Sequence, residues 1–237
     1  ADLLGLGDDP ARPAPAGDVL TLSRPASRCP QCGHLIRWYE NIPVLSWLAL
    51  RGRCAACQAP IAWRYPLVEA STALLFVLVG LHFGAVPQAL LWCGVVAVLL
   101  TAALIDWDTT LLPDDLTQPL LWAGLVSAAL GWNPTLPGGL TEALWGAVAG
   151  YLSLWSVTAL FKLVTGKVGM GQGDFKLLAA LGAWLGASMI LPIVLGSSII
   201  GAVIGIGMKL SGQLREGVYV PYGPFLAGAG PVVARAG

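Results

Sequence analysis

Two aspartates stand at the edges of strongly apolar runs, where a membrane protein rarely carries a charge. Asp106 ends the run from Ala89 to Ile105, and Asp174 follows Gly171-Gln172-Gly173 just before another apolar run. A carboxylate at the edge of hydrocarbon costs a few kcal/mol unless it is paired, hydrated or used, so such a residue is first taken as functional. Two of them suggest an acid/base pair, and an intramembrane aspartyl hydrolase is the first hypothesis.

The chemistry of such a pair is peptide hydrolysis. Two carboxylates that share a proton do not both ionise, so one acts as a base toward water and the other as an acid toward the peptide carbonyl and the leaving nitrogen. Other hydrolase signatures are absent, because the sequence contains neither GxSxG nor HExxH. The glycines before Asp174 lack the GxGxxG spacing of a nucleotide loop. They predict instead a backbone that lets a peptide approach.

Three further carboxylates follow Asp106 within ten residues. Asp108 lies two positions away, hence on a different face of a helix, so only one of the two is expected to point into a shared site. Asp114 and Asp115 follow Pro113, where carboxylates suit a helix N-terminus. We expect both to be capping residues. Lys176, just after Asp174, is expected to extend toward the membrane interface.

A cysteine pattern precedes the apolar part of the chain. Two CxxC pairs are separated by 21 residues and supply four thiolates, Cys29, Cys32, Cys54 and Cys57. This arrangement predicts a structural zinc site, with an iron-sulfur cluster as the alternative. A pair of disulfides is disfavoured on the cytoplasmic side of a membrane. Gly33 and Gly52 are expected to relieve the tight turns of the two knuckles.

The composition is that of a membrane protein. Of 237 residues, 56% are hydrophobic and 11% are charged, and the mean hydropathy is +0.73. With roughly 20 apolar residues per span, spans are predicted at residues 67–83, 87–105, 116–132, 142–164, 176–187 and 189–208, with a seventh from 222. A division at Ala187-Ser188 and a kink at Pro192 both fit the pattern between the last two complete spans. The expected fold is an all-α polytopic membrane protein with six to seven transmembrane helices.

Basic residues predict the orientation. Seven of the thirteen Lys and Arg lie before residue 65, and none lies between Arg64 and Lys162. The segments that carry them, including the one around Asp174, are therefore expected to face the cytoplasm. Counting spans brings the loop after Asp106 to the same side. The predicted domains are a small cytoplasmic zinc-binding head, residues 1–65, and a transmembrane helical domain with the aspartyl peptidase site, residues 66–237. Glu69 either assists that site or stabilises a helix N-terminus.

The chain resembles the type IV prepilin leader peptidases in three stretches, CPQCGHLIRWYENIPVLSWLALRGRCAACQAPIAWRYPLVE, LIDWDTTLLPDDLT and GMGQGDFKLLAALGAWLG. The resemblance covers roughly residues 28–226. It places the family's catalytic aspartates on Asp106 and Asp174 and its zinc cysteines on the four named above. The Gly-x-Gly-Asp element is also similar, more distantly, to that of presenilin.

The resemblance implies a bacterial inner-membrane enzyme that works at the cytoplasmic face. Its implied reactions are cleavage of the leader peptides of type IV prepilins and type II secretion pseudopilins, and N-methylation of the new N-terminus with S-adenosylmethionine. The implied partners are the prepilin and pseudopilin substrates and membrane lipid, and no nucleic acid is implied. Gly52 is expected either to contribute to methyl transfer or simply to form a knuckle turn.

One departure from the family and one alternative function are set against this assignment. Family members usually open with a hydrophobic span before the cysteines, but no run of spanning length precedes residue 65. The chain is therefore expected to be a piece of a longer protein or a naturally shortened one. The alternative function is a zinc-headed membrane transporter or assembly scaffold, because intramembrane carboxylates also serve proton pathways. The absence of an inverted repeat disfavours a transporter.

Overall fold

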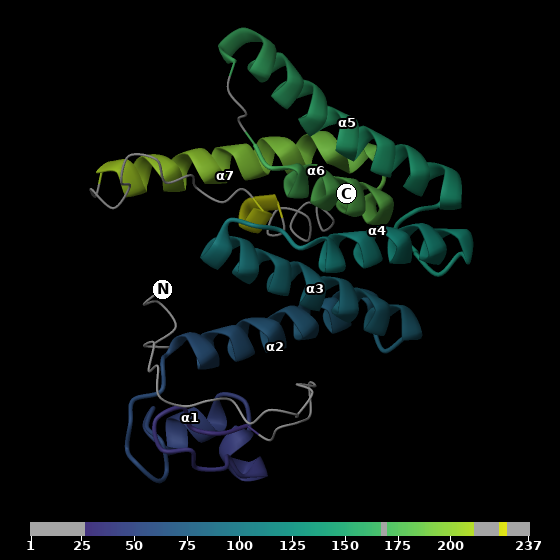
Figure 1. Ribbon diagram of the computed structural model, residues 1–237. Helices are drawn as coiled ribbons and strands as arrows, with labels where there is room; N and C mark the ends of the chain where they lie inside the picture. The colour runs from purple at the N-terminus through teal and green to yellow at the C-terminus, as the bar shows by residue number, and fades with distance from the viewer. Residues whose placement is uncertain (1–26, 167–169, 211–222, 227–237) are drawn as a thin grey trace, which may run out of the picture. The chain divides into compact units, whose positions relative to one another are not determined.

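The computed structural model describes residues 27–166, 170–210 and 223–226, and they are helical with no strand among them. Two isolated bridges, Arg28 with Leu35 and Arg53 with Pro60, are the β-type pairings found in this part of the chain. The order of elements is η2 (Trp38–Asn41), α1 (Leu45–Ala49), α2 (Arg64–Phe83), α3 (Pro87–Thr109), α4 (Asp114–Ala129), α5 (Gly139–Thr165), α6 (Gln172–Leu185), η3 (Ala187–Met189) and α7 (Ile190–Leu210). Figure 1 shows these helices along the chain.

The chain divides into two compact units, Ala1–Ala73 and Leu74–Gly237, each described here by itself. The first unit contains the four cysteines, η2, α1 and the beginning of α2. Its small interior forms around Trp47, whose Nε1 donates to the carbonyl of Ile61 at 3.3 Å. The predicted domain boundary at residues 65 and 66 stays a prediction.

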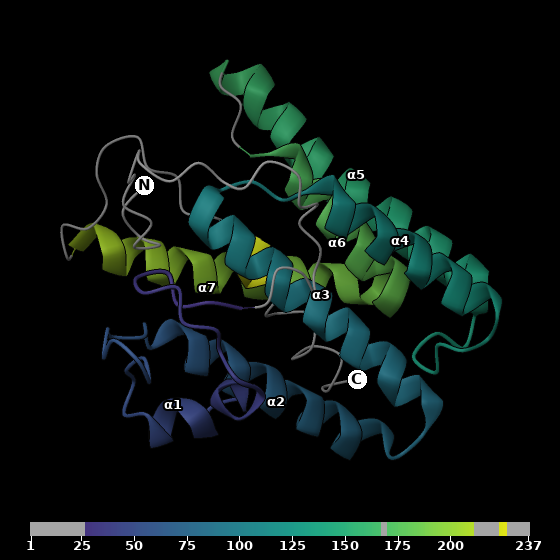
Figure 2. The same ribbon diagram turned by 60° about the horizontal axis from the view of Figure 1, so that its bottom comes forward.

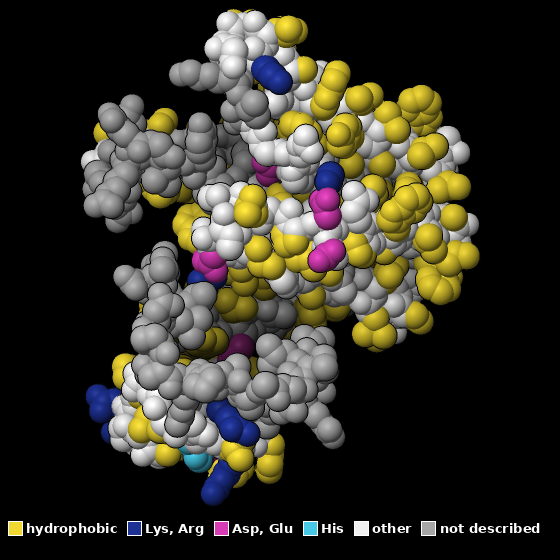
Figure 3. Space-filling model, in the orientation of Figure 1, with side chains coloured by type: hydrophobic (Ala, Val, Ile, Leu, Met, Phe, Trp, Pro, Cys, Tyr) yellow, Lys and Arg dark blue, Asp and Glu magenta, His cyan; other side chains and the backbone are white. Residues whose placement is uncertain are grey.

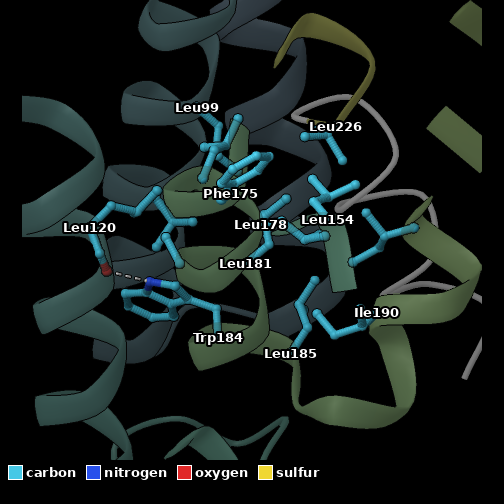
Figure 4. Packing of buried hydrophobic residues seen from close by; sticks show 14 of the residues in the cluster. Leu99, Leu120, Leu154, Phe175, Leu178, Leu181, Trp184, Leu185, Ile190 and Leu226 are labelled. Carbon is cyan, nitrogen blue, oxygen red and sulfur yellow. Dashed lines mark hydrogen bonds between the residues drawn. The ribbon is translucent and has the colours of Figure 1, made fainter. Parts of the chain in front are cut away.

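Helix α6 lies at the centre of the second unit. It contacts both α4 and α5, and the two views in Figures 1 and 2 show the three helices side by side. Every residue from Leu177 to Leu185 is buried, which is typical of a helix enclosed by others. Figure 4 shows its side chains, among them Leu178 and Leu181, packed against residues from the neighbouring helices.

Small residues allow the close approach of these helices. A methyl group at Gly146 of α5 would collide with the backbone of Gly182 in α6, and one at Gly150 would lie 2.5 Å from the carbonyl oxygen of Leu178. Such contacts between small residues are a common device of membrane helix packing. On the other side, Trp184 donates from Nε1 to the carbonyl of Leu120 in α4 at 2.9 Å, the dashed line of Figure 4.

The end of α6 decides between the two sequence interpretations of residues 177–208. Helix α6 ends before Gly186, whose φ of +81° belongs to the left-handed region. The carbonyl of Trp184 accepts hydrogen bonds from Asn133 Nδ2 and Thr135 Oγ1, both at 2.9 Å. The division near Ala187 is therefore confirmed. The kink at Pro192 is wrong as an explanation, because this proline lies in the first turn of α7, where its missing N–H costs no helical hydrogen bond.

Four helices are long and apolar enough to cross a membrane, Arg64–Phe83, Pro87–Thr109, Gly139–Thr165 and Ala187–Met208. They confirm a multi-pass, all-helical protein. Helices α4 and α6, with 16 and 14 residues, are shorter, so the count of six to seven stays a prediction. Most of the segment predicted as a last span lies outside the described residues. Figure 3 shows hydrophobic side chains covering the visible face over α4 and α5, as lipid contact requires.

Candidate aspartyl site and cysteine cluster

Asp106 and Asp174 are brought together by helices α3 and α6. Asp106 lies in the last turn of α3 and is 5% exposed, and Asp174 lies in the first turn of α6 and is 8% exposed. Leu112 lies beside both residues: a methyl group at Gly173, next to Asp174, would lie 2.7 Å from its Cβ, and one at Gly223 would lie 3.0 Å from its Cδ1. The N–H of Gly223 in turn bonds to Asp106. Their action as a pair that shares a proton stays a prediction.

A third segment reaches this site from the C-terminal part of the chain. The backbone N–H of Gly223 donates to Oδ2 of Asp106 at 3.0 Å. Residues 223–226 form a single helical turn, in which Phe225 and Leu226 are buried. No sequence pattern predicts a contact with Asp106. The only local signal is the Gly223-Pro224 pair, which is typical of a turn.

Gly173 has a packing role. A methyl group at this position would lie 2.7 Å from Cβ of Leu112, so the missing side chain lets the start of α6 approach the segment between α3 and α4. The expectation that the glycines before Asp174 let a peptide approach the backbone stays a prediction. Gly171 has no such contact, because a methyl group added there would meet only Oδ2 of Asp174, at 4.0 Å.

The other acidic residues separate as their positions predicted, with one exception. Asp108 is exposed while Asp106 is buried, which confirms that the two point to different faces. Asp114 and Asp115 lie in the first turn of α4, but neither side chain caps the helix. Asp114 instead binds Lys176, whose Nζ donates to both carboxylate oxygens at 2.7 Å. Capping is therefore wrong for both residues. The Asp114–Lys176 ion pair ties the starts of α4 and α6 together, and as an exposed pair it adds at most about 1 kcal/mol.

The four cysteines of the first unit form one cluster. The sulfurs of Cys29, Cys32, Cys54 and Cys57 all lie within 4.8 Å of one another, and all four thiols are free. Cys29 and Cys57 are 3.8 Å apart, and Cys32 and Cys54 are 4.0 Å apart. A tetrahedral ion with bonds of about 2.3 Å separates its sulfur ligands by about 3.8 Å, so the cluster fits a metal ion.

Both knuckles have the same backbone design. Backbone N–H groups of Cys32 and Gln31 bond to Cys29 and lower the pKa of its thiol to about 6. The N–H groups of Cys57 and Ala56 likewise lower the pKa of Cys54. Thiolates are the form that binds metal. After the second cysteine of each knuckle the backbone enters the left-handed region, at Gly33 with φ +70° and at Gln58 with φ +60°.

The glycine expected to open the second knuckle has a structural explanation. Gly52 has φ +68°, and a methyl group there would lie 2.8 Å from the Trp47 ring. Its role is thus the turn, one of the two roles expected for it. His34 lies outside the cluster, because its Nε2 is 3.2 Å from Oε2 of Glu40. Backbone N–H donation from Arg37, together with His34, holds the pKa of Glu40 below its usual value.

Glu69 has a structural contact within the first unit, and its proposed assistance to the aspartates stays a prediction. Its Oε2 accepts the backbone N–H of Val44 at 2.8 Å. Val44 has φ +61°, an unfavourable conformation for a β-branched residue. Glu69 therefore holds a strained turn of the first unit against the beginning of α2.

Comparisons with known proteins agree with these features. Residues 12–83 match the family model of the bacterial peptidase A24 N-terminal domain, and residues 93–206 match that of the type IV leader peptidase family. The chain is 54% identical over 217 residues to a prepilin leader peptidase/N-methyltransferase of Stutzerimonas stutzeri, covering 91% of this chain and 73% of that protein. A protein of the same name from Pseudomonas aeruginosa is 52% identical over 219 residues, covering 92% and 74%. No solved structure matches the chain.

The matched regions contain both candidate aspartates and all four clustered cysteines. The extent and identity of these matches confirm the family expected from the sequence motifs. The chain belongs to the type IV leader peptidase family, whose similar members are prepilin leader peptidase/N-methyltransferases.

Proposed function

We propose that this chain removes the leader peptides of type IV prepilins and type II secretion pseudopilins and then N-methylates the new N-terminal residue. The observation that carries the peptidase half is the burial of two carboxylates, Asp106 in the last turn of α3 and Asp174 in the first turn of α6. Family membership supports a hydrolase over the alternative of a zinc-headed transporter or scaffold.

The proposed hydrolysis needs no group beyond the two aspartates and water. The ionised carboxylate takes a proton from water as the water oxygen bonds to the peptide carbonyl carbon. The neutral carboxyl donates a hydrogen bond to the carbonyl oxygen and then gives its proton to the nitrogen as the C–N bond breaks. The proton held by the first carboxyl then passes to the second, which restores the starting pair.

The test of this function uses the purified full chain in detergent or lipid. A synthetic prepilin-like peptide, with a basic leader, a glycine and an apolar segment, is incubated with the protein and the products are identified by mass. We expect a leader-sized product that ends at the glycine. A peptide recovered intact under conditions where the protein is folded contradicts the peptidase assignment.

The proposed location is the bacterial inner membrane, with the aspartates at its cytoplasmic face. Besides the four helices that meet the length requirement, we count α4 and α6 as spans, because both pack within the helical unit that the longer spans form. Because these two helices are shorter than a full span, their ends, and with them Asp174, are expected to lie below the membrane surface on one side. The basic residues before residue 65 and those around Asp174 support the cytoplasmic orientation of these segments.

The proposed metal is one zinc ion on Cys29, Cys32, Cys54 and Cys57. The separations of the sulfurs and the N–H donors of the knuckles support a tetrathiolate site. Four protein ligands leave no open position, so the role of such an ion is structural. An iron-sulfur cluster is the alternative that metal analysis distinguishes.

Methyl transfer is expected to be separable from cleavage. Moving a methyl group from S-adenosylmethionine to an amine needs an unprotonated amine and a positioned donor, rather than two carboxylates that share a proton. The Asp174→Ala protein should therefore methylate a synthetic peptide that already lacks its leader. The measurement is incorporation of labelled methyl groups. Incorporation by the unaltered protein alone would show that both reactions use Asp174, and incorporation by neither would leave only the peptidase activity proposed.

A further inference from the structure

The two buried aspartates differ in their hydrogen-bonding surroundings. Oδ2 of Asp106 accepts a hydrogen bond from the backbone N–H of Gly223 at 3.0 Å. Within the described residues, no corresponding donor reaches the carboxylate of Asp174. Two carboxyl groups of the same type, both buried, are thus made unequal by one backbone amide.

The amide of Gly223 is held firmly in place. Leu226 is fully buried, and it shares a hydrophobic cluster with Phe175 and Leu178 of α6, as Figure 4 shows. Phe225 is 7% exposed, and its ring lies against Gly201 of α7. Because these side chains anchor the turn, the N–H direction is set before a substrate binds.

The position of Gly223 also leaves no room for a side chain. A methyl group there would lie 2.7 Å from Oδ2 of Asp106 and 3.0 Å from Cδ1 of Leu112. Any larger residue must displace the carboxylate or the turn. The requirement for glycine therefore comes from contact with Asp106.

We propose that Gly223 is a positioning residue, whose N–H keeps Asp106 as the ionised member of the pair and so makes Asp106 the base and Asp174 the acid. A backbone N–H bonds more strongly to a carboxylate than to a neutral carboxyl group. Asp106 then takes the proton from water, and Asp174 gives its proton to the leaving nitrogen. This assignment rests on the proposed peptidase function.

The kinetic test compares Gly223→Ala with Gly94→Ala, which adds the same methyl group to α3, the helix of Asp106, where nothing lies within 4 Å. Alanine keeps the N–H, but its methyl group should push Oδ2 of Asp106 out of hydrogen-bond range. We therefore expect Gly223→Ala to lower kcat by about 10- to 100-fold, the effect of losing a hydrogen bond to a charged group, while KM changes little. Gly94→Ala should stay within about 2-fold of the unaltered protein, since no contact is added. Equal kcat values for the two variants overturn the role of Gly223.

A spectroscopic test applies even if Gly223→Ala fails to fold. Tyr222-Gly223 is the only Tyr-Gly pair in the sequence, so ¹³C′-Tyr and ¹⁵N-Gly labelling selects the Gly223 amide in the full chain. We expect a downfield amide proton that moves upfield in Asp106→Ala and stays in Gly94→Ala. With ¹³Cγ-Asp labelling, the carboxylate signal of the pair should disappear in Asp106→Asn and the carboxylic acid signal in Asp174→Asn. The reverse loss, or an amide proton insensitive to Asp106→Ala, contradicts the inference.

These outcomes separate the inference from the function on which it rests. If Asp106→Asn cleaves the peptide normally, the peptidase site itself is misassigned. If Asp106→Asn is inactive but Gly223→Ala is as active as Gly94→Ala, only the role of Gly223 is wrong.

Discussion

Replacing either Asp106 or Asp174 by asparagine should lower kcat for leader cleavage by roughly 10²- to 10⁴-fold, the usual contribution of one acid or base. Asparagine nearly preserves the shape of the side chain, but its amide neither takes a proton from water nor supplies one to the leaving nitrogen. Both residues are buried, so no solvent-exposed group readily replaces them. The measurement is cleavage of the prepilin-like peptide by equal amounts of folded protein.

The matched control is Asp115→Asn. Asp115 is exposed in the first turn of α4, near the site along the chain but outside the buried pair, and its replacement should change kcat by less than about 2-fold. Asp114 is less suitable, because its loss also breaks the bond with Lys176. Near-normal turnover by Asp106→Asn would falsify its assignment as half of the catalytic pair.

Removing one thiolate of the cysteine cluster should release the metal and unfold the head. The described part of the head has few buried apolar side chains, and Cys54 is its one buried hydrophobic residue. Zinc binding contributes on the order of 10–16 kcal/mol in small zinc-finger peptides, far more than such an interior supplies. Cys32→Ser should therefore lose the ion and most amide protection over residues 27–62. Elemental analysis and hydrogen exchange measure the two effects.

Cys93→Ser provides the control for thiol loss. Cys93 is a free cysteine in α3 and is not one of the four that cluster, so its replacement should leave one zinc per chain and an intact head. Iron in the unaltered protein, or two disulfides without metal under reducing conditions, would replace the zinc assignment by one of its alternatives.

Helix positions and the composition of the two sites could be inferred from local sequence. Apolar runs broken by Gly, Pro and Asp predict the long helices, because each span must satisfy its own backbone hydrogen bonds in lipid. The two CxxC pairs predict a four-thiolate cluster, since each knuckle is built from residues that are neighbours in the sequence. The helix end at Gly186 was less determined, because Ala187 and Pro192 are both plausible places for a break when only hydropathy is considered.

Contacts between distant segments could not be inferred in this way. Lys176 meets Asp114 across 62 positions, and Leu112 fills the space beside Gly173. Neither pairing leaves a periodic pattern in the chain, because each depends on how α4 and α6 pack. The same packing explains why Asp114 pairs with Lys176 instead of capping α4, and why residue 173 has no side chain.

The sequence by itself singled out the candidate residues, two aspartates at the edges of apolar runs and four cysteines in paired spacing. The proposals of acid/base catalysis and metal binding follow from their residue types and spacing, which do not depend on the packing. Only the tertiary structure decided that the amide of Gly223 donates to Asp106, 117 positions away. A hydrogen bond of this kind uses the backbone, which is the same at every residue, so no side-chain pattern announces it.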